Sequence, residues 1–203
     1  MIRRTKTRLF LILFLLGFTG VASLLLIDIS AIVALLPATI DVPTITPSLK
    51  LLSLVQPTLI LIVAVLIGVA LAPRVGLSAP AAEALADGDG GDVFTSLRPQ
   101  LAPGVLGGLA GGICIVLISL LTKPFLAGPA IDRIGKFSRI LPLPTRILYG
   151  GITEELLLRW GLMTLIVWAA WRVLQKGQNQ PTSAYFVGAI LPSSLVLALD
   201  IFP

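Results

Sequence analysis

The sequence predicts an all-α membrane protein, a polytopic helix bundle of about four to five transmembrane helices. Of its 203 residues, 56% are hydrophobic and only 12% are charged. The mean hydropathy is +1.01, and a soluble domain of this length could not cover so much apolar surface with its own polar groups. Uncharged stretches long enough to cross a bilayer recur along the chain. The lipid bilayer is therefore the expected partner of most of this surface.

The first predicted span runs from Leu9 to Ile27, after a basic flank made up of Arg3, Arg4, Lys6 and Arg8. Basic residues collect on the cytoplasmic side of membrane proteins, so the N-terminus is expected to be cytoplasmic. A signal peptide cleaved near Ala22 is the competing interpretation. The apolar sequence that continues to Leu36, and the further spans, favour a retained helix.

The second predicted span runs from Leu51 to Ala72, with Pro57 as a kink or an early-turn residue. The connection before it holds Asp41, Pro43 and Pro47, and it is not expected to be helical. Residues 1–72 thus form two N-terminal transmembrane helices.

A change in composition marks residues 73–103 as a polar Gly/Pro-rich loop outside the membrane. Its Asp87-Gly88-Asp89-Gly90-Gly91-Asp92 run superficially resembles a calcium-binding loop. The twelfth position counted from Asp87 is Arg98 rather than glutamate, so the spacing favours a solvated flexible linker.

Residues 104–203 form the remaining membrane core. Its first span, from Gly104 to Leu121, has closely spaced glycines that allow another helix to approach; they are Gly104, Gly107, Gly108, Gly111 and Gly112. The basic, proline-broken segment from Lys123 to Arg146 predicts a short amphipathic helix at the interface.

A fourth span is predicted from Thr145 to Trp171, and a fifth from Ser183 to Pro203, separated by a polar turn over 172–181. If the N-terminus is cytoplasmic and every segment crosses once, the basic 123–146 segment falls on the disfavoured side. The charge distribution therefore leaves open whether one segment is re-entrant, the span count differs by one, or the local charge bias is overruled.

The most informative segment is Glu154-Glu155-Leu156-Leu157-Leu158-Arg159, inside the fourth span. A charged side chain costs about 2.5–3.5 kcal/mol at the centre of a membrane helix, so such residues usually face a partner or a wet cavity. On an α-helix Glu155 and Arg159 align and can pair, whereas Glu154 lies about 140° from Arg159. Burial away from that cation would raise the proton affinity of Glu154, which suits a general base.

The same residues fit a second interpretation. Thr153 could cap a helix that begins at the membrane surface, with both glutamates in its first turn, where the helix dipole favours negative charge. Leu156 to Trp171 would then form a shorter span.

Glu-Glu-x-x-x-Arg in a membrane helix, followed by Gly161, resembles the first motif of the CAAX prenyl protease and bacteriocin-processing family. This family comprises intramembrane endopeptidases, among them type II CAAX prenyl endopeptidases and abortive-infection proteins. The resemblance covers about Leu101 to Pro203. It implies that Glu154 activates the attacking water, and that Glu155 and Arg159 organise the site.

The second motif of the family, Phe-x-x-x-His, aligns with Val196 and Asp200, and the chain contains no histidine. An ionised Asp200 can only accept hydrogen bonds, and it would repel nearby glutamates. The resemblance implies a divalent metal as a candidate cofactor, although Glu154, Glu155 and Asp200 offer no nitrogen ligand for zinc and would suit magnesium better. Alternatively, Asp200 is a helix-end residue near the interface.

Three hypotheses about function follow. The chain is an endopeptidase acting on membrane-associated peptides or proteins in a bacterial inner membrane, an inactive or truncated homologue that binds a membrane partner, or a protein with an ion or proton path. Nucleic acid is not an expected partner, because the sequence has no basic stripe interleaved with aromatic residues.

Overall fold

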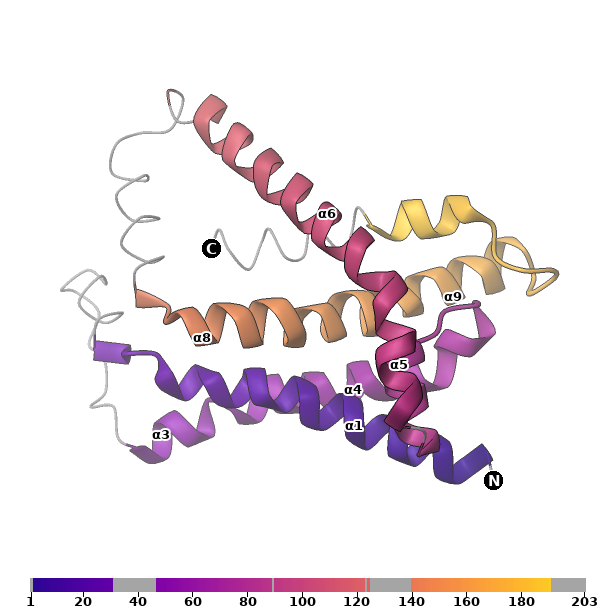
Figure 1. Cartoon of the computed structure of the whole chain (residues 1–203), viewed down its shortest axis with the longest axis horizontal. Helices are drawn as coiled ribbons and strands as arrows, with labels where there is room; N and C mark the ends of the chain where they lie inside the picture. The colour runs from indigo at the N-terminus through magenta and orange to yellow at the C-terminus, as the bar shows by residue number, and fades with distance from the viewer. Residues whose placement is uncertain (1, 31–46, 89, 123, 125–139, 191–203) are drawn as a thin grey trace.

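The structure is a computed structural model, and it describes residues 2–30, 47–88, 90–122, 124 and 140–190. Within these ranges every regular element is helical (Figure 1), so the predicted all-α class is confirmed. The first half contains α1 (Ile2–Ser23), η1 (Leu24–Leu26), α3 (Pro47–Leu52), α4 (Val55–Leu71), η2 (Ala72–Arg74) and α5 (Pro80–Asp87). The second half contains α6 (Gly90–Thr122), α8 (Leu143–Thr145), η4 (Arg146–Thr153), η5 (Leu156–Met163) and α9 (Thr164–Leu174).

Four continuous helical stretches in the described part are long and apolar enough to cross a membrane: Arg4–Leu26, Pro47–Arg74, Asp92–Thr122 and Leu143–Leu174. They correspond to the first four predicted spans. Pro57 lies in the first turn of α4, so of the two predictions for this residue, the early-turn position is confirmed. Of the fifth predicted span, residues 183–190 are helical. The remainder of that span, most of the predicted amphipathic helix, and the connection holding Asp41 and Pro43 lie outside the described residues.

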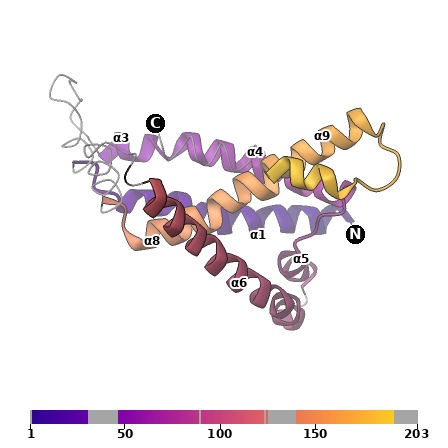
Figure 2. The same cartoon turned by 90° about the horizontal axis from the view of Figure 1, so that it is seen from above.

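The core of the bundle forms where α1, α4 and the fourth span, Leu143–Leu174, run side by side (Figures 1 and 2). On the fourth span, α1 packs against η4, while α4 packs against η5 and α9. Apolar side chains from the first two spans fill the main core, and they include Leu9, Leu13, Val21, Leu61 and Val65. A smaller cluster of Val75, Val167 and Ala189 joins the far end of the fourth span to the last described helix.

Glycine allows the three core spans to approach closely. A Cβ on Gly20 of α1 would collide with the Thr153 hydroxyl and with the backbone carbonyl of Leu148. A Cβ on Gly161 would lie 2.6 Å from the Cβ of Ala64 in α4. Small residues at helix crossings are the usual means of association in lipid, where no hydrophobic driving force acts between helices.

The prediction that residues 73–103 form a loop is wrong for most of this segment. Pro80 occupies the first turn of α5, where its missing N–H costs nothing, and the Glu83 carboxylate accepts a 3.1 Å hydrogen bond from the Ala79 N–H. Gly88 ends the helix in a left-handed conformation, φ 93°. Helix α6 then starts at Gly90 and continues through Pro99 and Pro103. The polar composition reflects exposure and does not prevent helix formation.

The predicted close approach of another helix to the glycines of α6 is also absent from the described part of the chain. Cβ atoms built on Gly104, Gly107, Gly108, Gly111 and Gly112 would meet nothing within 4 Å. In Figure 1, α6 crosses the bundle obliquely and extends away from it. Its apolar surface is therefore available to lipid.

Candidate functional site

The helix that carries the Glu-Glu-x-x-x-Arg motif is wound more loosely than an α-helix. Over η4 and η5 its backbone forms π-helix, and the Glu154 N–H donates to the carbonyl of Tyr149, five residues earlier. Such an i→i+5 ladder brings residues five apart to the same side of the helix, whereas an α-helix would separate them by about 140°. π-Helical turns are rare and are frequently found at functional sites.

Thr153 does not cap a helix start, so the second interpretation of this segment is wrong. The helix continues from Leu143 to Leu174 through Thr153. The Thr153 side chain is fully buried, and its hydroxyl donates a 2.7 Å hydrogen bond to the carbonyl of Gly17 in α1. Its role is to join the first and fourth spans.

Glu155 and Arg159 form the predicted ion pair, with 3.0 Å between Arg159 Nε and Glu155 Oε2. The pair faces outward, because 46% of the Glu155 side chain and 74% of the Arg159 side chain are exposed. Neither residue lines the cavity described next. This position does not support the role of site organisers that the family resemblance implied for them.

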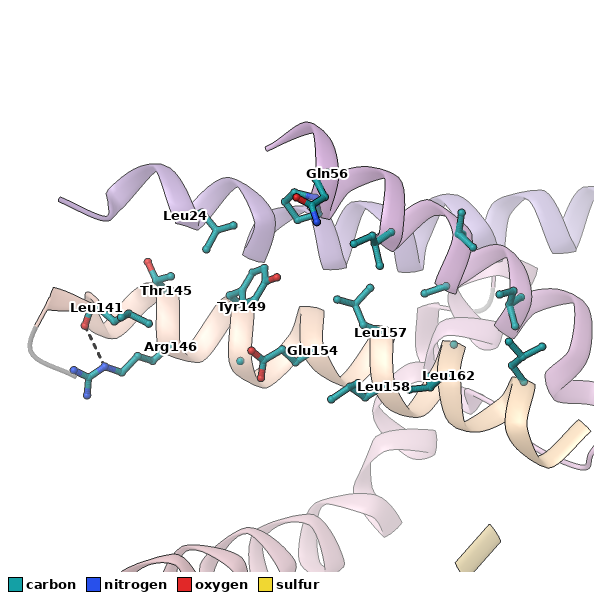
Figure 3. Close-up of a pocket in the computed structure, with 18 residues that line it drawn as sticks. Leu24, Gln56, Leu141, Thr145, Arg146, Tyr149, Glu154, Leu157, Leu158 and Leu162 are labelled. Atoms are coloured by element: carbon teal, nitrogen blue, oxygen red, sulfur yellow. Dashed lines mark hydrogen bonds between the residues drawn. The ribbon is translucent and has the colours of Figure 1, made fainter. Parts of the chain in front are cut away.

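Glu154 has a different environment, as predicted. It is half-buried and lines a groove of about 900 Å³ between α4 and the fourth span. Figure 3 shows its carboxylate turned back along the helix toward Tyr149. Gly150 lies beside it, and a Cβ there would make an ordinary contact with Glu154 Oε2, at 3.7 Å.

The groove exists because α4 and the fourth span diverge. They are in tight contact at Ala64 and Gly161, and they separate toward Gln56 and Arg146 (Figure 3). The end near the helix crossing is lined by aliphatic residues, including Ile60, Val63, Ile67, Leu157, Leu162 and Leu165. The wider end also presents polar side chains, namely Gln56, Thr145, Arg146, Tyr149 and Glu154. One end of the groove is therefore apolar, and the polar side chains gather at the other, together with apolar residues such as Leu24 and Leu141.

The polar side chains that line the groove together with Glu154 were not found from the sequence. Gln56 reaches the groove from the second span, almost 100 residues away along the chain. Tyr149 shares the helix with Glu154 but faces the same side only because of the π-helical winding. Arg146 donates a 3.1 Å hydrogen bond from Nε to the carbonyl of Leu141, which holds its guanidinium beside Leu141 at the groove's wider end. The only local signal was a polar Gln beside Pro57 in an apolar span.

Val196 and Asp200, the positions aligned with the second family motif, lie outside the described residues. Among the residues that are described, no three acidic, histidine or cysteine side chains come together in a way that could hold a metal. Glu154 and Glu155 point to different surroundings, so the described donors do not fit the divalent metal that the resemblance suggested.

Comparison with known proteins finds no family model, no curated protein and no solved structure that matches this chain.

Proposed function

We propose that this protein is an intramembrane endopeptidase that cleaves membrane-associated polypeptides, with Glu154 as the base that activates water. One observation carries the proposal: Glu154 lies in a groove within the membrane-spanning bundle, at the junction of a polar end and an apolar end. The resemblance of the Glu-Glu-x-x-x-Arg segment to the CAAX prenyl protease and bacteriocin-processing family supports the same reaction class.

The groove provides the elements that hydrolysis needs. Its polar end can admit water to the Glu154 carboxylate, while its aliphatic end can bind an apolar segment of the substrate. Hydrolysis also needs hydrogen-bond donors for the developing oxyanion. The Tyr149 hydroxyl and the Gln56 amide line the same end of the groove as Glu154 and are the candidates for this role.

The shape of the groove favours a substrate site over an ion or proton path. A path across the membrane requires polar groups or water along its length. Here the polar side chains gather at one end, and α4 meets the fourth span at Ala64 and Gly161 near the other. An apolar end suits an aliphatic side chain and offers no ligand to an ion.

The proposed setting is a bacterial inner membrane with the N-terminus in the cytoplasm. The basic residues at the start of α1 support this orientation through the positive-inside rule. In that orientation the wider end of the groove lies on the opposite side of the membrane from the N-terminus.

The deciding experiment is cleavage of a quenched membrane-peptide library by the purified protein in lipid vesicles, comparing the native chain with Glu154→Gln. The substitution keeps the side-chain shape but removes the proton acceptor, so turnover should fall by at least about 100-fold, the usual contribution of a general base. Asp92→Asn removes an exposed carboxylate at the start of α6 and serves as a matched control, with turnover expected to equal that of the native chain.

Equal turnover by native and Glu154→Gln protein would reject Glu154 as the base. Absence of cleavage by a correctly inserted native chain would instead favour the hypothesis of an inactive homologue, and binding of the same peptides would then be measured. Asp200→Asn is compared in parallel. A similar loss of turnover would assign this residue to the site.

A further inference from the structure

The ion pair of Glu155 and Arg159 is not accounted for by the groove. Arg159 is at the middle of the 32-residue fourth span, and three quarters of its side chain is exposed. Charged residues inside membrane spans almost always face a protein interior, a water-filled cavity or another charge, because hydrocarbon does not solvate them. A distance of about 15 Å separates the bilayer centre from either interface, so the charge is remote from the headgroups.

Pairing with Glu155 only partly satisfies Arg159. The guanidinium carries five N–H donors, and Nε is the atom that contacts Glu155 Oε2. An exposed Glu155 carboxylate likewise retains acceptor capacity. A partner that covers this face must therefore supply a carboxylate to Arg159 and a cation to Glu155.

We propose that the face formed by Glu155 and Arg159 binds the same face of a second copy of this chain. The pair is self-complementary. When two fourth spans meet about a twofold axis along the membrane normal, identical residues lie opposite one another at the same depth, and Glu155 of each copy reaches Arg159 of the other diagonally, one helical turn along the axis. A four-charge network then replaces two pairs exposed to lipid.

This interface is compatible with the proposed catalytic site, because it uses residues that do not line the groove. It does not depend on the proposed function. Neighbouring positions on the fourth span also favour close approach, since Gly151 lies one turn before Glu155 and a Cβ there would meet nothing within 4 Å.

The test uses the full chain in lipid vesicles, labelled in two colours, with energy transfer measured over a series of protein-to-lipid ratios. The native chain is expected to dimerise. Glu155→Arg and Arg159→Glu should each weaken self-association by about 3-fold to 20-fold, the range for one polar contact between membrane helices, because all four charges at the interface then have the same sign. Mixing the two variants should restore association as a heterodimer, because each face then meets its opposite charge.

The double variant E155R/R159E keeps the ion pair with its polarity reversed, so it should dimerise like the native chain. If reversal of a single charge prevents insertion, the uncharged variant E155Q/R159Q takes its place and is expected to associate about 3-fold to 20-fold more weakly than the native chain. A native chain that stays monomeric at every dilution would overturn the proposal. So would inserted variants that dimerise as well as the native chain, or a mixture that fails to associate.

Discussion

At the scale of single residues, the contacts between spans depend on a few small side chains. Gly20 and Thr153 lie at the crossing of α1 with η4, and Gly161 lies at the crossing of α4 with η5. Lipid solvates apolar surfaces as well as a protein core does, so close packing and hydrogen bonds between helices carry the stability. A single added methyl group at these positions is therefore expected to matter.

Gly20→Ala should lower the free energy of unfolding by about 1–3 kcal/mol, the usual cost of overpacking. Its new Cβ would collide with the Thr153 hydroxyl and with the Leu148 carbonyl, and a backbone carbonyl cannot relieve the clash by changing rotamer. Gly108→Ala is the matched control, because its Cβ meets nothing, and alanine in a helix should leave stability unchanged or raise it by up to about 1 kcal/mol. Denaturant titration in mixed micelles measures both. Equal effects of the two substitutions would contradict the crossing.

Thr153→Val removes the hydrogen bond from the Thr153 hydroxyl to the Gly17 carbonyl while keeping the side-chain shape. Hydrogen bonds between membrane helices contribute about 0.6 kcal/mol on average and at most about 1.7 kcal/mol, so a loss in this range is expected. Thr122→Val serves as the comparison, since the Thr122 hydroxyl bonds only to carbonyls of its own helix. A loss for Thr122→Val as large as that for Thr153→Val would show that the hydrogen bond between spans is not the cause.

At the scale of helices, hydropathy was sufficient to predict where the first four spans lie, because the membrane requires about 20 apolar residues wherever a helix crosses it. Hydropathy failed between 73 and 103, where the polar composition suggested a loop. Pro80 and Gly88 in this segment mark the start and the end of the helix α5. The π-helical winding around Glu154 was not predictable. The span prediction depends on the apolar pattern alone. This pattern does not show whether an N–H donates to the carbonyl four residues earlier, as in an α-helix, or five residues earlier, as in a π-helix.

The site was predicted only in part, for a related reason. Glu154 was found because a carboxylate in an apolar span is conspicuous by itself. Gln56 and Tyr149 became visible only when the structure placed α4 beside η4 and set the pitch of the helix. The spacing of four residues correctly predicted the ion pair of Glu155 with Arg159, but the structure places that pair on the outer side of the helix.

Gly88→Ala tests the helical assignment of α5. The left-handed backbone at Gly88 costs a residue with a Cβ about 1–2 kcal/mol, and no neighbouring atom within 4 Å would contribute to the loss. Hydrogen exchange of the amides in 80–88 should accelerate by about 5-fold to 30-fold, if opening of α5 is the step that allows exchange. Exchange in the fourth span is the internal reference and should not change. A flexible linker would show rapid exchange before the substitution and no response to it.

At the scale of the whole molecule, the geometry relates the groove to the two sides of the membrane. The Thr145 hydroxyl donates a 2.8 Å hydrogen bond to the Ser23 carbonyl, so the fourth span starts beside the C-terminal end of α1. The N-terminal end of this 22-residue helix lies about 33 Å away, at the same end of the bundle as the end of α9 (Figures 1 and 2). The basic sequence between Thr122 and Ile140 opposes a cytoplasmic N-terminus, but the charges flanking the first helix usually dominate.

Cysteine labelling in intact cells tests this orientation. In a Cys114→Ser background, Leu143→Cys should react with a membrane-impermeant maleimide added outside, because Leu143 is exposed at the start of the fourth span. Thr7→Cys, near the start of α1, should react only after the cells are permeabilised. The reverse labelling pattern would place the N-terminus outside.

The two walls of the groove enter the membrane at different times, because the spans are synthesised in order from the N-terminus. Helices α1 and α4 contact one another and leave the ribosome first, but the wall that carries Glu154 follows about 80 residues after α4 ends. At roughly 5–20 residues per second, the first two spans wait several seconds in the bilayer for that wall. During that interval Gly17 and Gly20 of α1 have no fourth span to contact, so an insertion chaperone or a neighbouring nascent helix could occupy their surface. The groove therefore forms only after the fourth span has displaced any such temporary partner from α1.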